Sequence, residues 1–162
     1  MIGFRKTGLL ITALVMLMAI GMAVDNFNLS AVAFGAMVVL PAFYFNEAEP
    51  VFYVWIYRET SLGFLKKKAW FAIVNLLIYA LPAMILLMVV FQAQWWIPPL
   101  IFIGGMVFML VMITAKYAVY PSEIGIAQAV LLYLSFQLPP LLLVVVPLFI
   151  KRSKRNLQSY LS

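Results

Sequence analysis

The chain has 162 residues, of which 67% are hydrophobic and only 10% are charged. Soluble domains are usually about half apolar and about a quarter charged, so a soluble core of this length cannot hide so much apolar surface. The chain contains no cysteine and no histidine. This excludes disulfides, metal sites built from thiolate or imidazole, haem ligation by histidine and Ser-His-Asp catalysis. We predict a non-enzymatic integral membrane protein without a cofactor, a metal or a catalytic residue.

Five apolar runs predict an all-α, polytopic helical bundle, with residues 1–162 forming a single transmembrane domain. About 20 apolar residues cross the roughly 30 Å of hydrocarbon in a bilayer. Not every run has to cross, so we expect four to five transmembrane helices. The runs lie at residues 8–24, 29–45, 69–91, 100–115 and 124–150.

The first two runs are separated by a polar turn at residues 25–28. Gly21 and Ala23 resemble the small residues of a signal-peptide cleavage site, but we expect the first run to be retained as a helix. In the second run, Pro41 is expected to kink the helix near its end.

Residues 51–68 combine aromatic and charged side chains, a pattern typical of the membrane–water interface. We expect a short interfacial helix that ends in a basic anchor. Two interpretations remain open: a plain anchor, or a docking element for a cytoplasmic partner such as an ATPase. The docking residues would be Arg58, Glu59, Lys66, Lys67 and Lys68.

The acidic break before this segment contains Glu47 and Glu49. One interpretation makes them ligands of an ion or substrate near the membrane surface. The plainer interpretation is a solvated loop beside Pro50.

Several polar or helix-breaking residues interrupt the later apolar runs. Amides at depth either join helices or line a path, and prolines mark binding sites in some transporters but are common in membrane helices. Lys116 and Glu123 lie on either side of Pro121 and would pair across a turn or line a path. Alternatively, the Lys116 side chain extends from a helix end to the membrane surface. The candidates are Asn75, Pro82, Lys116, Glu123, Gln137, Pro139 and Pro140.

The basic clusters set the expected topology. Positive residues favour the cytoplasm, which puts residues 5–6, 66–68 and 151–155 on that side. Three apolar runs separate the last two clusters, so either the rule is broken or one of the three runs does not cross. The paired prolines make residues 124–150 a candidate for a re-entrant segment. The other candidate is the run at 100–115, which is short and contains Gly104 and Gly105, a pair that allows close packing or a bend. We expect four crossings with both termini inside; five crossings with the tail outside is the rival.

Anionic lipid is the default partner of the basic tail, and no nucleic acid is expected.

The acidic break, the segment Arg58-Glu59-Thr60-Ser61-Leu62-Gly63-Phe64-Leu65-Lys66-Lys67-Lys68 and the long apolar run that follows resemble part of bacterial ABC-2-type transporter permeases. Residues 115–121, 138–142 and 154–157 are similar to the ends of some bacterial permease-like proteins. The resemblance covers roughly residues 45–160. It implies a location in the bacterial inner membrane and a separate ATPase, because the chain has no Gly-rich phosphate loop. Such permeases usually have six spans, one more than this chain has apolar runs.

The leading hypothesis is thus a permease-like component of an ABC-type transporter. The alternative is a scaffold or assembly subunit that transports nothing, because the apolar runs hold few polar groups for a solute path. A serine–lysine dyad is the remaining enzymatic arrangement, although the spacing of Ser135 and Lys116 does not favour it. Four or five helices can wall a pore only by association, so we expect a homo- or hetero-oligomer.

Overall fold

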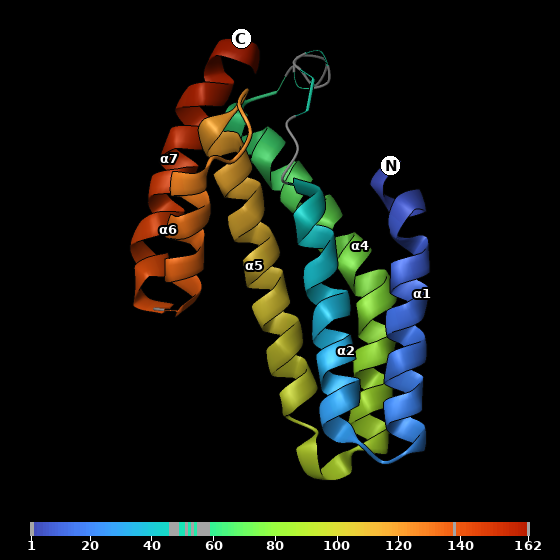
Figure 1. Ribbon diagram of the computed structural model, residues 1–162. Helices are drawn as coiled ribbons and strands as arrows, with labels where there is room; N and C mark the ends of the chain where they lie inside the picture. Colours follow the sequence, from blue (N-terminus) through green and yellow to red (C-terminus); the bar gives the residue numbers. More distant parts are fainter. Residues whose placement is uncertain are drawn as a thin grey trace. The chain divides into compact units, whose positions relative to one another are not determined.

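The computed structural model describes residues 2–45, 49–50, 52, 54, 59–137 and 139–161, and all regular secondary structure in these ranges is helical. This confirms the predicted all-α class. The α-helices, drawn in Figure 1, are α1 (Ile2–Ala23), α2 (Phe27–Val39), α4 (Ser61–Val90), α5 (Ile97–Val119), α6 (Ile126–Gln137) and α7 (Leu142–Leu161). Three short 3-10 helices join them: η1 (Leu40–Phe45), η2 (Gln92–Gln94) and η3 (Pro139–Leu141).

Two of these helices, α4 with 30 residues and α5 with 23, are long and apolar enough to cross a membrane. Shorter apolar stretches lie at Gly8–Ala23, Phe27–Phe43 and Ile126–Ser135. The chain divides into two compact units. Unit 1 contains residues 1–44 and 72–109, and unit 2 contains residues 45–71 and 110–162.

Unit 1 is built on an antiparallel hairpin of α1 and α2 (Figure 1). The turn between them forms where the sequence predicted it. Asp25 adopts a left-handed backbone conformation with φ of 53°, which aspartate tolerates better than most residues. The side chain of Asn26 then accepts a hydrogen bond from the backbone N–H of Leu29 and caps the start of α2, as asparagine favours.

Glycine allows close helix packing at two places in unit 1. A Cβ on Gly21 would overlap Ser30 of α2, and the Ser30 hydroxyl donates to the carbonyl of Met18 at 3.1 Å. A Cβ on Gly105 of α5 would overlap the Val38 side chain, whereas a Cβ on Gly104 would meet nothing within 4 Å. The sequence marked the glycine pair as a close-packing or bending site, and the structure assigns the close contact to Gly105 alone.

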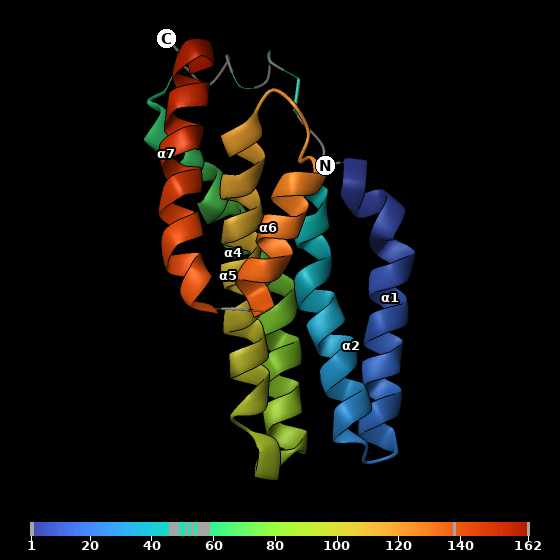
Figure 2. The same ribbon diagram turned by 60° about the vertical axis from the view of Figure 1, so that its left-hand side comes forward.

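Unit 2 contains the start of α4, the end of α5 and a hairpin of α6 and α7, which are joined through η3 (Figures 1 and 2). The last apolar run is therefore not one helix. Pro139 and Pro140 lie in η3, where the chain reverses. Proline cannot donate an N–H and clashes with the preceding turn, so a helix through residues 124–150 must end there.

Other prolines act less strongly. Pro82 lies inside α4 and Pro147 inside α7, and both helices continue past them. Before Pro41, α2 ends at Val39 and the chain continues as η1, which agrees with the expected disruption near that residue.

The interfacial segment differs from the prediction at its carboxyl end. We expected residues 51–68 to form a separate short helix, but Ser61–Lys68 are the first turns of α4 and continue directly into the apolar run. The hydroxyl of Thr60 accepts from the N–H of Gly63 at this start, which is the capping role that threonine favours. Residues 51, 53 and 55–58 lie outside the described residues.

Candidate functional site

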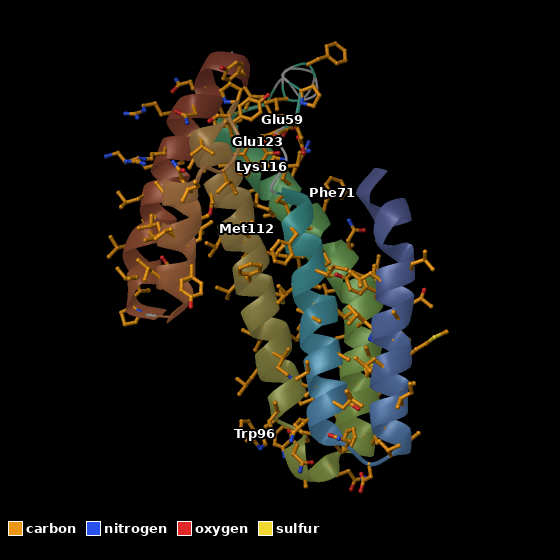
Figure 3. All side chains as sticks on the ribbon, viewed as in Figure 1. Glu59, Phe71, Trp96, Met112, Lys116 and Glu123 are labelled. Atoms are coloured by element: carbon orange, nitrogen blue, oxygen red, sulfur yellow. The ribbon has the colours of Figure 1, made fainter. Side chains whose placement is uncertain are left out.

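A partly buried carboxylate joins three segments of unit 2. Glu49 lies in the stretch before α4, Lys68 lies in the second turn of α4, and Lys116 and Tyr117 lie in the last turn of α5. We call these four residues the Glu49 cluster. Figure 3 shows Lys116 near the carboxyl end of α5, with Glu59 and Glu123 labelled near the same end.

Both oxygens of Glu49 accept hydrogen bonds. The Lys68 Nζ lies 3.0 Å from each oxygen, and the Lys116 Nζ lies 3.3 Å from Oε1. The Tyr117 hydroxyl donates to Oε2 at 3.1 Å, and the Tyr120 hydroxyl donates to the backbone carbonyl of Glu49 at 3.1 Å. Charge-assisted hydrogen bonds of this kind are stronger than neutral ones, so the cluster ties the Glu49 segment to both helices.

Aromatic rings surround the two ammonium groups. The Lys116 Nζ lies 5.8 Å from the centroid of Phe45 and 5.4 Å from that of Tyr117, and the Lys68 Nζ lies 5.5 Å from that of Phe64. These distances fall within cation–π range. Phe64 and Tyr117 also stack edge to face at 5.2 Å. Lys116 is only 3% exposed, and such burial of a lysine requires paired charge.

The environment fixes the protonation state of the carboxylate. Burial by itself raises the pKa of Glu49, but the charges of Lys116 and Lys68 and the hydrogen bonds from Lys68 and Tyr117 outweigh it and lower the pKa. Burial and the neighbouring Glu49 and Tyr160 raise the pKa of Tyr120, which therefore remains a phenol donor. A carboxylate that is ionised and shared by two lysines is a weak base, which suits a structural lock better than acid–base chemistry.

Helix α7 is fixed to α5 by polar side chains that the sequence did not single out. The Ser153 hydroxyl is within donating distance of the Thr114 carbonyl of α5 at 2.8 Å and of the Phe149 carbonyl of its own helix at 2.7 Å. The Asn156 amide donates to the Ala118 carbonyl at 2.7 Å. One turn further on, Tyr160 stacks on Tyr120. These contacts advance in the same direction along both helices, so α7 runs parallel to α5. Both helices therefore end at the same end of unit 2.

The predicted docking residues separate into different roles. Lys66 and Lys67 are exposed on the first turns of α4, and Lys67 pairs with Glu59. Lys68 belongs to the Glu49 cluster and is turned inward. Arg58 lies outside the described residues, as does Glu47.

The predicted path residues do not converge either. Lys116 pairs with Glu49 rather than with Glu123, which is exposed. Asn75 is exposed on α4. Gln137 ends α6, and the prolines that follow it form the turn between α6 and α7. In the candidate dyad, the Ser135 hydroxyl donates to the Leu131 carbonyl of its own helix.

The described residues contain no group of three or more side chains suited to hold a metal ion. Comparisons with protein-family models, curated proteins and solved structures found no match to the chain.

Proposed function

We propose that this chain is an integral membrane protein that crosses the bilayer four times and acts as a non-enzymatic subunit. The observation that best supports this proposal is the exposure of its two longest apolar helices. Only 22% of the most apolar window of α4 and 39% of that of α5 are buried. The core helix of a soluble protein is mostly buried, whereas lipid-facing helices expose their apolar side chains.

The aromatic residues on these helices support the same proposal. Exposed Trp70 lies near the start of α4, and exposed Trp95 and Trp96 follow its end. The 20 residue steps from Trp70 to Val90 span about 30 Å at about 1.5 Å each, which matches the hydrocarbon thickness. Tryptophan is enriched at both membrane interfaces.

The hairpin of α6 and α7 supports four crossings rather than five. Helix α6 has 12 residues, or about 18 Å of length, and the apolar part of α7 before Lys151 is about 14 Å long. Each is about half of the bilayer's hydrocarbon thickness. A re-entrant hairpin of this length returns the basic tail to the side where α5 ends.

Single cysteines test this topology cleanly, because the chain has no cysteine of its own. We expect a membrane-impermeant maleimide to label Asn26→Cys and Gln94→Cys on intact cells, and to label Ser122→Cys and Gln158→Cys only after permeabilisation. Labelling of Gln158→Cys from outside would establish a fifth crossing. Release of the chain by alkaline carbonate would remove the membrane proposal altogether.

The more specific proposal is a permease-like component of an ABC-type transporter in the bacterial inner membrane, working with a separate ATPase. It is supported by Lys66 and Lys67, whose side chains are exposed at the start of α4, with Lys67 also paired to Glu59. Exposed lysines are complementary to an acidic partner surface. The substitution of both lysines by glutamine should reduce the recovery of a co-purifying ATPase. The matched control, Lys151→Gln with Lys154→Gln, removes the same charge and should leave recovery unchanged.

A scaffold or assembly subunit without transport activity is the second candidate. It is favoured by Lys116 of α5, because its ammonium group is bound to Glu49 and therefore does not line a path. Purification from the native membrane in mild detergent, followed by mass spectrometry, separates the two. A stoichiometric ATPase supports the permease, and an unrelated membrane complex supports the scaffold.

A further inference from the structure

One face of α4 carries a regular stripe of exposed residues within unit 1. The α4 stripe consists of Asn75, Ile78, Pro82, Ile85 and Val89. All five are exposed, and the three apolar side chains are 69%, 51% and 62% exposed. The spacing alternates between three and four residues, which is the spacing of a helix–helix seam. The opposite face carries Ala72, Leu76, Ala80, Ala83 and Leu87, which are buried.

Two features of the stripe are unsuited to lipid. Asn75 places a primary amide among apolar side chains, and none of the hydrogen bonds assigned among the described residues involves that amide. Pro82 has no N–H, so the Ile78 carbonyl lacks the donor that a helix normally supplies four residues later. Asn75 lies five residues after Trp70, about 7 Å deeper along the helix. In hydrocarbon, such polar groups are satisfied by neighbouring helices.

We propose that the α4 stripe is the contact surface for a second copy of this chain, joined at Asn75. This inference rests on the proposed membrane insertion. Copies of one chain insert in the same orientation, so a two-fold axis along the membrane normal brings Asn75 to the same depth in both. A carboxamide contains both donors and an acceptor. Two Asn75 side chains can therefore pair with each other.

The chemistry of the stripe favours a second copy over other occupants. A lipid tail offers no hydrogen bond, and a charged partner surface finds no charged side chain within the stripe. The amide is complementary to itself, and the branched side chains of Ile78, Ile85 and Val89 provide apolar packing on either side of the pair. Pairing of α4 helices would also double the number of crossings from four to eight.

Cysteine cross-linking in native membranes tests the contact. We expect oxidation to give disulfide-linked homodimers with Ile78→Cys and Ile85→Cys. The matched control is Ile103→Cys, which makes the same substitution at an exposed position of α5 in unit 1 and should remain monomeric. Equal cross-linking at all three positions would indicate random collision and overturn the proposal, as would no cross-linking at positions 78 and 85.

The role of the amide is tested by dimer affinity in detergent. Asn75→Leu should weaken the dimer by about threefold to thirtyfold, the range implied by interhelical hydrogen bonds in membranes, while Asn75→Gln should retain most of the affinity. If Asn75→Leu dimerises as well as the original chain, the amide has no role and the proposal fails.

Two outcomes separate this inference from the proposed function. If the cysteines at positions 78 and 85 cross-link to a different protein, the stripe binds another subunit, so the second copy is refuted while membrane insertion stands. If alkaline carbonate releases the chain, the membrane proposal itself fails, and the cross-linking result is then interpreted for a soluble assembly.

Discussion

The two units are stabilised by different kinds of contact. In unit 1, helices approach through glycine and apolar side chains, and the Ser30 hydroxyl donates a hydrogen bond to the Met18 carbonyl. In unit 2, the Glu49 cluster and the hydrogen bonds from α7 to α5 join segments far apart in the sequence. Apolar packing tolerates rotation and sliding, whereas directed polar contacts fix one arrangement. The comparison predicts that changes of charge and pH mainly affect the stability of unit 2. Changes in the volume of packed side chains should mainly affect the stability of unit 1.

The largest effect is expected from removing the shared carboxylate of unit 2. Glu49→Ala should lower the free energy of unfolding by about 2–3 kcal/mol. This is below the roughly 3–5 kcal/mol for a fully buried pair, because the Glu49 side chain is 25% exposed. Thermal unfolding in detergent measures the change. Glu123→Gln, which removes an exposed charge of the same sign, is the control, and an equal loss in both variants would contradict a specific lock.

A volume change in unit 1 should have the next largest effect. Gly105→Ala adds a methyl group against Val38 and should destabilise the protein by about 1–2 kcal/mol, the range expected for overpacking. Gly104→Ala adds the same methyl group into open space and should be neutral or slightly stabilising, because alanine favours a helix over glycine. The same unfolding measurement compares the pair, and equal effects would show that the Val38 contact is not close.

The attachment of α7 should be weaker than the ion cluster. Ser153→Ala removes the hydrogen bond to the Thr114 carbonyl and should cost about 1 kcal/mol. Gln158→Ala, at an exposed position of the same helix, should change stability little. Limited proteolysis of the C-terminal tail provides the more local measurement, with faster cleavage expected only in Ser153→Ala.

The smallest effect is expected from mild acid. The pKa of Glu49 is lowered in the folded protein from its ordinary value of 4.5. A lowered pKa contributes stability above the unfolded value, which is lost as the pH falls through the folded value. The stability difference between the original chain and Glu49→Gln should therefore be constant near pH 7 and shrink below about pH 4.5. A difference that grows on acidification would reverse the assigned sign.

Local sequence patterns predicted the elements of unit 1 well. The polar turn at residues 25–28, the disruption at Pro41 and the close packing at the glycine pair all depend on neighbouring residues, and the structure has each of them at or next to the predicted position. The helical state of Ser61–Lys68 was also expected, but not its continuity with the apolar run. Charged residues at the start of a helix do not end it, because straight-chain lysine is a good helix former.

Local sequence patterns do not predict the Glu49 cluster of unit 2. Glu49 and Lys116 are 67 residues apart, and nothing in either local pattern specifies the other. Glu49 was therefore interpreted as a loop residue or an ion ligand. Tyr117 and Tyr120, three residues apart on one face near the end of α5, were the available signal, because phenols at a helix end often seek a polar partner.

Composition and periodicity by themselves determined the helical class, the apolar character of the chain, the positions of the apolar runs and the absence of thiol and imidazole chemistry. These properties depend on which residues are present and on their immediate neighbours. Only the tertiary structure decided that Lys116 pairs with Glu49, that the last apolar run folds back as a hairpin whose second helix runs parallel to α5, and that Asn75 is exposed on α4. Each depends on contacts between segments that are far apart in the sequence, and the energies of such contacts are not encoded in any local pattern.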